Sequence, residues 1–322
     1  MRAFQLTSYE GPGALELVEV PEPEADGQVL LEVEAIGINF PDLLITKGQY
    51  QHRPEPPFVP GCEIAGVVRE APEGSGWRAG DRAAAFVWDG GYAELAVVPL
   101  NALMRLPDAA DAATGAGMVV NYHTTYFALR RRGRLQEGET VLVLGAAGGI
   151  GTAAVQVAKG LGARVVVGGV ADERQAETAR AAGADEVVVL GEGFSAQVRE
   201  LVGGRGVDVV LDPLGDWIFD EAIRALAPEG RILVVGFAAG EIPRLRVNRL
   251  LLRNVDAVGV AWGAFLDIDR QLMADASRAL SELFAAGAVR PQIAARYRFE
   301  EIPAALRRLE RGEIPGKAVV EV

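Results

Sequence analysis

The sequence predicts an α/β protein that combines a doubly wound, parallel six-stranded sheet with an antiparallel β-barrel. Two observations carry this prediction. In the central part of the chain, short apolar strands are separated mostly by helical stretches, as in βαβ units with helices on both faces of a sheet. In the amino-terminal part, glycine- and proline-rich turns join the strands, as in a small barrel. The length of 322 residues is sufficient for two domains.

The barrel is predicted from β-rich segments near the amino terminus. They are residues 3–6, 15–20, 29–38, 63–68, 82–87 and 91–97. The proline-rich stretch 53–61 is too short to link two domains, so we expect it to shape a loop. A helix over residues 121–132 should then carry the chain from the barrel to the sheet.

The parallel sheet is predicted from apolar segments farther along the chain. They are residues 140–144, 164–168, 186–190, 207–212, 231–236 and 255–260, with a helix over 172–182. Afterwards we expect an amphipathic helix over 269–286, a strand over 294–299, a helix over 303–311 and a strand over 316–322. The final strand is expected to return to the barrel.

A glycine turn between a strand and a helix is the most informative motif. Residues 145–151 read Gly-Ala-Ala-Gly-Gly-Ile-Gly and are followed by good helix formers. Gly148 lets the backbone approach a pyrophosphate closely, Gly151 lets the helix pack on the strand, and the helix N-terminus offers unpaired N–H groups to an anion. The motif predicts a dinucleotide site that includes Ala147, Gly148, Gly149, Ile150 and Gly151.

Two further turns follow strands of the predicted sheet. Asp212 begins Asp-Pro-Leu-Gly after the fourth strand, and Gly236, Phe237 and Ala238 follow the fifth. Dinucleotides bind at the carboxyl ends of such strands, so we expect these residues to contact the cofactor. The alternative is that both segments are ordinary turns that end a strand.

The end of the second strand bears on the choice of cofactor. An acid there would hold the ribose 2′-hydroxyl of NAD, but the strand ends without one and is followed by Gly169, which we expect to contact the cofactor. Arg174 stands nearby as a partner for the 2′-phosphate of NADP. Asp172 and Glu173 oppose this interpretation if they lie near the ribose, but they can also begin the next helix. The sequence favours NADPH over NADH.

Composition excludes several classes of function. The net charge of −12, from 32 basic and 44 acidic residues, argues against nucleic-acid binding, although Arg130 to Arg134 include a local basic cluster. One cysteine and two histidines without clustered spacing argue against zinc. No apolar run could span a bilayer, and no signal-peptide core is present. We therefore expect a cytoplasmic protein without metal or membrane partner.

Taken together, several motifs resemble the zinc-free quinone oxidoreductase, or zeta-crystallin-like, branch of the medium-chain dehydrogenase/reductase superfamily. The matching segments are residues 37–42, 56–63, 80–82, 121–126, 145–151, 212–215, 236–238 and 316–317. The resemblance implies a GroES-like barrel from residues 1–120, completed by 263–322, and a Rossmann domain over 121–262, with the active site in the cleft between them. It also implies a homodimer that pairs the sixth strands, residues 255–260.

Some positions depart from the family pattern. Zinc-dependent members of the superfamily place a cysteine at or near Asn39 and a histidine at Cys62, and neither ligand is kept here. Gln175 falls where a lysine often contacts the 2′-phosphate, so Arg174 must substitute or the affinity for NADPH must fall. His123 stands where the family usually has glycine, beside the nicotinamide.

The resemblance and the local chemistry name three candidate catalytic residues. Asn39 matches a cleft position of the family, and Asp42 follows it in the same turn, where both residue types also serve local hydrogen bonding. Tyr50 could donate its hydroxyl to a carbonyl oxygen on which charge develops. The alternative for Tyr50 is an aromatic residue on the rim.

Three further residues have two interpretations each. Thr124 resembles the family residue that touches the nicotinamide amide, but a helical threonine can also bond its own backbone. Cys62 either lines the cleft, where a quinone or enone could alkylate it, or is a small inert core residue. Lys317 either reaches the cofactor or forms a salt bridge at the surface.

We therefore predict an NADPH-dependent enzyme that transfers hydride to a quinone or another α,β-unsaturated carbonyl without a metal. One alternative is an enoyl-thioester reductase, which would need basic residues for a phosphorylated carrier. The other is an NADPH-binding sensor or stress protein with little turnover.

Overall fold

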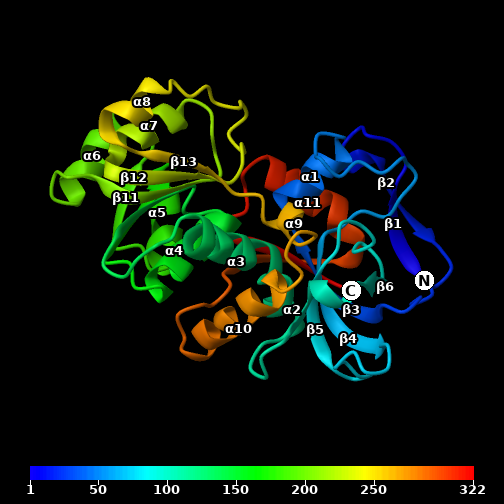
Figure 1. The fold of residues 1–322 in the computed structure, drawn as a ribbon. Helices are drawn as coiled ribbons and strands as arrows, with labels where there is room; N and C mark the ends of the chain where they lie inside the picture. The colour runs from blue at the N-terminus through cyan, green and yellow to red at the C-terminus, as the bar shows by residue number, and fades with distance from the viewer. The chain divides into compact units, whose positions relative to one another are not determined.

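The computed structural model describes residues 1–322, and the chain divides into two units (Figure 1). The first unit contains residues 1–120, 266–278 and 293–322. The second contains residues 121–265 and 279–292. Residues 279–292, which the sequence analysis placed with the barrel, therefore pack with the sheet unit. None of the helices has the length and apolar character needed to span a membrane.

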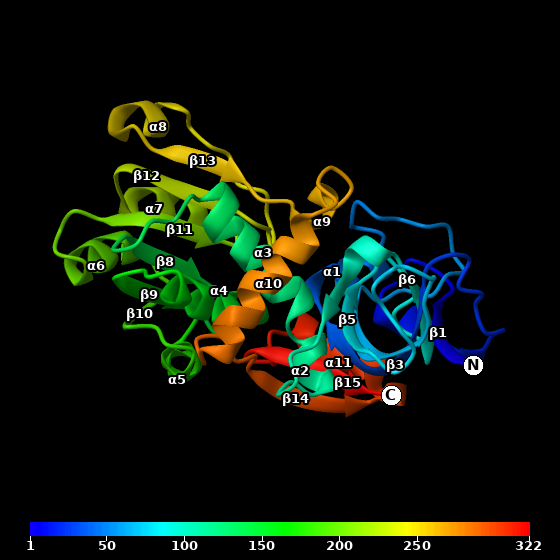
Figure 2. The same ribbon diagram turned by 60° about the horizontal axis from the view of Figure 1, so that its bottom comes forward.

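The first unit is built on a seven-stranded sheet and a separate two-stranded one. The strands are β1 (Arg2–Leu6), β2 (Leu15–Glu19), β3 (Val29–Ile38), β4 (Glu63–Glu70), β5 (Arg82–Phe86), β6 (Leu95–Val98), β7 (Leu103–Arg105), β14 (Ile293–Arg298) and β15 (Lys317–Glu321). The larger sheet has the order β14-β15-β3-β4-β5-β7, with β6 also paired to β3. All pairs are antiparallel except β14 with β15, which lie side by side in Figure 2.

The long strand β3 organises this unit. It pairs with β4, β6 and β15, and its core residues Val29, Leu31, Val33 and Ile36 are almost fully buried. Ala318 of β15 lies opposite Ile38, so the prediction that the last strand returns to the barrel is confirmed. The helices of the unit are α1 (Phe40–Thr46), α2 (Ala112–Ala116) and α11 (Ile302–Glu310), with 3-10 turns η1 (Pro12–Ala14), η2 (Leu100–Ala102) and η4 (Phe299–Glu301).

The second unit is a doubly wound parallel sheet of six strands, as predicted. The strands are β8 (Thr140–Leu144), β9 (Val165–Val170), β10 (Glu186–Val189), β11 (Val207–Asp212), β12 (Leu226–Val234) and β13 (Asp256–Gly259), in the order β10-β9-β8-β11-β12-β13. Its helices are α3 (Val119–Tyr126), α4 (Gly149–Gly160), α5 (Glu173–Ala181), α6 (Phe194–Leu201), α7 (Ile218–Ala225), α8 (Asn248–Arg253) and α9 (Trp262–Phe265). Helices α4 and α5 cover one face, and α6 and α7 cover the other (Figure 1).

Several boundaries differ from the prediction. The helix expected over 121–132 is α-helical only to Tyr126 and continues as the π-helical turn η3 (Phe127–Arg132), in which the Gly133 N–H bonds the Ala128 carbonyl. Strand β12 begins at Leu226, before the apolar run that predicted it. The amphipathic helix is α10 (Leu272–Ala285), whose core residues include Met273, Leu280 and Phe284.

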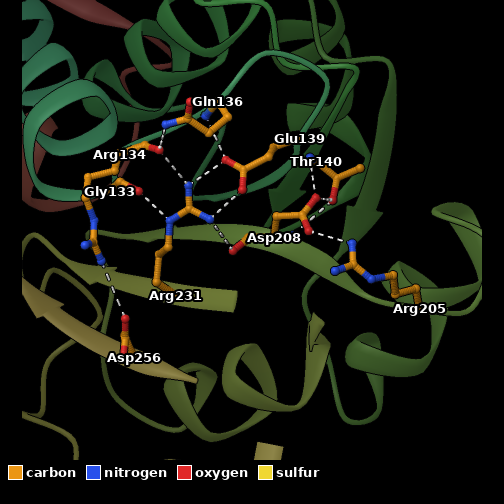
Figure 3. Close-up of polar contacts among 9 residues, drawn as sticks. All are labelled: Gly133, Arg134, Gln136, Glu139, Thr140, Arg205, Asp208, Arg231 and Asp256. Atoms are coloured by element: carbon orange, nitrogen blue, oxygen red, sulfur yellow. Dashed lines mark hydrogen bonds and ion pairs between the residues drawn. The ribbon is translucent and has the colours of Figure 1, made fainter. Parts of the chain in front are cut away.

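A buried arginine fixes the loop that enters β8 (Figure 3). The Arg231 side chain on β12 forms two hydrogen bonds with the Glu139 carboxylate, at 2.8 and 2.6 Å, and donates to the carbonyls of Gly133, Arg134 and Asp208. Burial alone would raise the pKa of Glu139, but the bonds from Arg231 and the Gln136 N–H keep it below its usual range. The loop from η3 to β8 is therefore attached to β12 and to the start of β11.

Loss of the charge on Glu139 should destabilise this unit. Glu139→Gln leaves the Arg231 guanidinium largely buried without a counter-charge, which should lower the free energy of unfolding by about 2–3 kcal/mol in urea titrations. Arg205→Gln is the matched control, because it breaks an ion pair whose arginine is exposed and should cost less than about 1 kcal/mol. Equal stability of the two variants would contradict the assignment.

Candidate functional site

A buried polar cluster lies where three neighbouring strands of the first unit meet. Asn39 follows β3, Glu63 begins β4 and Lys317 begins β15. Because β15, β3 and β4 are adjacent and β3 runs antiparallel to the other two, the end of β3 lies beside the starts of its neighbours. The sheet topology therefore brings together three residues that are far apart in the sequence.

The hydrogen bonds of this cluster leave little freedom to its side chains. Lys317 Nζ lies 2.5 Å from both Glu63 Oε2 and Asn39 Oδ1. Asn39 Nδ2 donates to Glu63 Oε2 at 3.0 Å and to the Gly37 carbonyl at 3.1 Å, and the Val120 N–H donates to Glu63 Oε1 at 2.8 Å. All three side chains are buried. The Lys317–Glu63 pair thus fixes the orientation of the Asn39 amide.

Glycine is required beside this cluster. A Cβ on Gly37 would lie 2.4 Å from Glu63 Oε2 and 2.1 Å from the Ala116 carbonyl oxygen. Such distances are shorter than side chains tolerate, and the Ala116 contact is with backbone. The close approach of β3 to α2 and to the ion pair therefore depends on Gly37.

Asp42 supports the same turn from the first turn of α1. Its carboxylate accepts from the N–H of Asn39 at 2.8 Å and from the N–H of Cys62 at 3.1 Å. Full burial raises its pKa to about 6, although these hydrogen bonds and the charge of Lys317 oppose the rise. The local hydrogen bonding that the sequence left open for Asp42 is thus present.

The Asp42 carboxylate influences the pKa of two tyrosines. Burial, with the charges of Cys62 and Asp42, raises the pKa of Tyr50 to about 12, so its hydroxyl keeps its proton at neutral pH. Burial and Asp42 also raise the pKa of Tyr92, whose buried hydroxyl has no hydrogen-bond partner. The charge of Asp42 thus acts on both tyrosines, and Tyr50 is partly exposed.

Cys62 has the properties of an unreactive thiol. It is buried, its Sγ lies 3.7 Å from Asn39 Nδ2, and burial followed by the charge of Asp42 raises its pKa well above the usual range. Reactive cysteines are partly exposed and have lowered pKa values. The structure therefore favours the core interpretation of Cys62 over the reactive one.

The donor set of the chain does not suit a zinc ion. No group of three or more His, Cys, Asp or Glu side chains is placed to hold a metal. Lys317, Asn39 and Glu63 are bonded to one another, and Cys62 is the one cysteine of the sequence. The expectation of a surface salt bridge for Lys317 was wrong, because the salt bridge that it forms with Glu63 is buried.

In the second unit, the glycine turn has the geometry of an anion site. Helix α4 starts at Gly149 with Gly148 as its N-cap, and no side chain caps it. A Cβ on Gly151 would lie 2.0 Å from the Gly145 carbonyl oxygen, so glycine is needed for the close packing of α4 on the turn. Gly148, Gly149 and Ile150 are partly exposed, whereas Ala147 is buried. The uncapped N–H groups of the first turn are thus available to an anion.

Asp212 is placed at the carboxyl end of β11. Its Oδ1 accepts from the N–H groups of Leu214 and Gly215, both at 2.9 Å, while its buried Oδ2 has no hydrogen-bond partner. Burial raises its pKa. A turn is therefore present, as one interpretation expected, but the free oxygen is a feature that a turn alone does not explain.

The segments after β11 and β12 lie together. The Gly236 N–H approaches the Asp212 carbonyl at 3.4 Å, and the Ala238 N–H donates to the Pro213 carbonyl at 3.0 Å. Phe237 between them is exposed. The structure thus brings Asp212, Gly236 and Ala238 together at the carboxyl ends of β11 and β12. Gly169 is the next-to-last residue of β9, which is separated from β11 by β8.

The residues after β9 have a defined arrangement. Asp172 caps α5 by accepting from the N–H groups of Arg174 and Gln175, which is the helix-start alternative of the sequence analysis. The Arg174 side chain is 90% exposed and forms an ion pair of 2.6 Å with Asp172. A phosphate bound by Arg174 would therefore compete with Asp172.

Helix α3 contributes Thr124 and His123. Thr124 is partly exposed, and the backbone bond expected as its alternative is made by its neighbour Thr125, whose Oγ1 donates to the Tyr122 carbonyl at 3.1 Å. His123 is buried with its ring centroid 5.6 Å from that of Trp262.

The sequence analysis missed Glu63 and Tyr92 as parts of the site. Glu63 was noted only as a motif residue, yet a carboxylate at the start of an apolar strand is a signal that a buried cation lies nearby. Tyr92 gave no such signal in the sequence, and in the structure its buried hydroxyl has no hydrogen-bond partner.

Known proteins are similar to this chain in sequence and fold. The model for an alcohol dehydrogenase GroES-like domain matches residues 25–108, and that for a zinc-binding dehydrogenase matches residues 149–281. Quinone oxidoreductase-like protein 2 of Bos taurus is 34% identical over 100% of this chain and 92% of its own. A probable oxidoreductase from Mycobacterium abscessus is 47% identical with a TM-score of 0.92, covering 100% of this chain and 99% of that one. The quinone oxidoreductase from Thermus thermophilus, solved also with NADPH, is 37% identical with a TM-score of 0.84 over 100% of both chains.

The raised pKa of Asp42 predicts a pH-dependent stability. Between pH 3.8 and about pH 6, the folded protein should hold a proton that the unfolded chain has released, so the free energy of unfolding should fall as the pH rises through this window. Asp42→Asn should remove this component, roughly 1–3 kcal/mol. Urea titrations at several pH values measure it.

Asp108→Asn is the matched control, because it removes an exposed carboxylate of the same unit. It should keep the wild-type pH profile. A wild-type profile in Asp42→Asn would contradict the assignment.

Proposed function

The chain belongs to the quinone oxidoreductase (zeta-crystallin-like) branch of the medium-chain dehydrogenase/reductase superfamily and is an NAD(P)H-dependent oxidoreductase, and on this premise we propose that it reduces a quinone or another α,β-unsaturated carbonyl with NADPH. The observation that carries the proposal is the uncapped start of α4 beside the close contact of Gly151 with Gly145. This cradle suits a pyrophosphate, and the T. thermophilus relative was solved with NADPH.

The residues of the second unit fit a dinucleotide. We assign Gly148, Gly149, Ile150 and Gly151 to the pyrophosphate and the free Oδ2 of Asp212 to a donor of the bound cofactor. Further assigned contacts are Thr124, Ala147, Gly169, Gly236, Phe237 and Ala238. The bound nicotinamide supplies the hydride.

The preference for NADPH rests on Arg174. Its guanidinium is free to meet a 2′-phosphate apart from its single bond to Asp172. To bind the 2′-phosphate, Arg174 must break its ion pair with Asp172 or divide its donors between Asp172 and the phosphate. We therefore expect a moderate preference for NADPH over NADH rather than an absolute one. Lys317 is assigned no cofactor contact, since its amine is held by Glu63 and Asn39.

The first unit supplies a proton-bearing donor for the substrate carbonyl. Both N–H groups of the Asn39 amide are already used, by Gly37 and Glu63, and Asp42 is fully buried. We therefore assign Asn39 and Asp42 to positioning. Tyr50, which stays neutral and has no such bonds, is assigned to donate its O–H to the carbonyl oxygen as negative charge develops there. Water can supply the final proton.

The donor set also supports chemistry without zinc. A zinc site needs three or four convergent ligands, and Asn39, Cys62 and Lys317 do not provide them.

We further propose a cytoplasmic location, because the lone free cysteine suits a reducing compartment.

Turnover with quinones tests the function. The purified protein should oxidise NADPH with ortho- or para-quinones and simple enones, and more slowly with NADH. Tyr50→Phe should lower kcat by about tenfold or more with little change in NADPH affinity, because the lost donor acts mainly in the transition state. Tyr297→Phe on β14 is the control, because it removes a hydroxyl whose hydrogen-bond partner is Arg308 on α11.

Each other outcome would count against the proposal. Turnover only with a short enoyl-CoA would favour the thioester reductase, and tight NADPH binding without turnover would favour the sensor. An unchanged kcat in Tyr50→Phe would refute the donor role while leaving the reaction in place.

We also propose a homodimer that pairs β13 with its copy. This strand is at the edge of the sheet, so one row of its backbone groups is unpaired. Beside it in the sequence, Leu251 and Leu252 on α8 are both 75% exposed, and Ile242 and Val247 are both 73% exposed.

A mass measurement tests this assembly. Light scattering should give twice the chain mass of 34.1 kDa, and Leu251→Glu with Leu252→Glu should shift the protein toward monomer by placing charges in the interface. Leu201→Glu, an exposed leucine on α6, should leave the mass unchanged. A monomeric wild-type protein would overturn the proposal.

A further inference from the structure

Four arginines gather around an open pocket on the second unit. The pocket, which we call the arginine pocket, has a volume of about 680 Å³. Its charged lining residues are Arg199 of α6, Arg224 of α7, Arg249 and Arg253 of α8, and one acid, Glu200 of α6. Figure 1 shows these three helices grouped together on the sheet. Such a concentration of positive charge is unexpected in a chain of net charge −12.

Only two of the four arginines have acidic partners. Arg224 forms ion pairs with Asp220 at 2.9 Å and Glu221 at 2.6 Å, and Arg249 pairs with Asp220 at 3.3 Å. These bonds resemble ordinary surface ion pairs on α7. They do not by themselves indicate a ligand.

Arg199 and Arg253 have no carboxylate partner. Arg199 donates one bond, at 3.1 Å, to the Gly204 carbonyl, and Arg253 donates one, at 3.0 Å, to the Arg224 carbonyl. Each guanidinium has five N–H groups, so most of its donors remain for water or a ligand. Both side chains are half-buried, and partial burial followed by the charge of Arg199 lowers the pKa of Arg253. Because both guanidinium groups line the same pocket, their like charges repel each other.

The pocket extends to the end of the sheet opposite the glycine turn. Gly204, Arg224 and Arg253 come shortly before the starts of β11, β12 and β13. Gly148 follows the carboxyl end of β8, and in a parallel sheet all carboxyl ends lie at one edge. The pocket is therefore distinct from the dinucleotide site.

We propose that the arginine pocket binds a small phosphorylated molecule whose phosphate group bridges Arg199 and Arg253. A phosphate carries the two negative charges that would relieve the repulsion, and its oxygens match the fork of a guanidinium. The pocket is much larger than a phosphate ion, and Ala196 and Ile223 in its wall can contact a less polar part of the ligand. This site goes beyond the proposed reductase reaction and does not depend on it.

Calorimetry with inorganic pyrophosphate, at constant ionic strength, tests the proposal. The full chain should bind pyrophosphate with a dissociation constant in the millimolar range or below, both with and without saturating NADPH. Arg199→Gln and Arg253→Gln should each weaken binding by about tenfold, the loss expected for a charged hydrogen bond. Arg180→Gln on α5 removes an exposed arginine of the same unit and should leave the affinity unchanged. Thermal unfolding without phosphate checks that each variant folds.

Several results would overturn the proposal. One is the absence of binding, and another is equal weakening in all three variants, which would indicate general attraction to positive charge. Displacement of pyrophosphate by NADPH would place it in the dinucleotide site. Citrate binding as tightly as pyrophosphate would show that the site is not selective for phosphate.

Discussion

The ion pair between Lys317 and Glu63 is the constraint on which the first unit depends. Two charges removed from water must be paired and hydrogen-bonded, or folding loses several kcal/mol. Here Asn39 and the Val120 N–H complete the pair, so the start of β15, the start of β4 and the turn after β3 must be in place together. The last strand of the chain is thereby tied to its central strand. Gly37 belongs to the same constraint, because any side chain there would occupy the space of Glu63.

The second unit depends instead on backbone contact. Gly151 allows the first turn of α4 to lie against the Gly145 carbonyl, and a methyl group at this position would collide with backbone that cannot move aside. The same contact places the uncapped N–H groups of α4 just beyond the end of β8. The packing of α4 and the exposure of its anion-binding N-terminus thus both depend on Gly151. A sequence that keeps the strand and the helix but loses this glycine would lose both.

The sequence predicted the parts of the molecule that follow from periodicity and turn chemistry. The six strands of the parallel sheet and the glycine turn are of this kind, because β-branched runs and the glycines are local signals. The partners of Lys317 were not predictable, since Glu63 and Asn39 come close to it only through the order of β15, β3 and β4. The π-helical end after Tyr126 was missed for a similar reason. Helix-forming residues 127–132 do not reveal the i→i+5 bond of Gly133.

The number of hydrogen-bond donors that a side chain already uses within the protein distinguishes residues that stabilise the fold from residues that can bind a ligand or substrate. Arg231 directs all five of its N–H groups to Glu139 and to backbone carbonyls, so it can only be structural (Figure 3). Arg199 and Arg253 use one bond each, and their remaining donors lie in an open pocket. The same count distinguishes Asn39, whose amide is fully bonded, from Tyr50, whose hydroxyl is not. The arginines therefore have different roles in this chain because their hydrogen-bond donors are used to different extents.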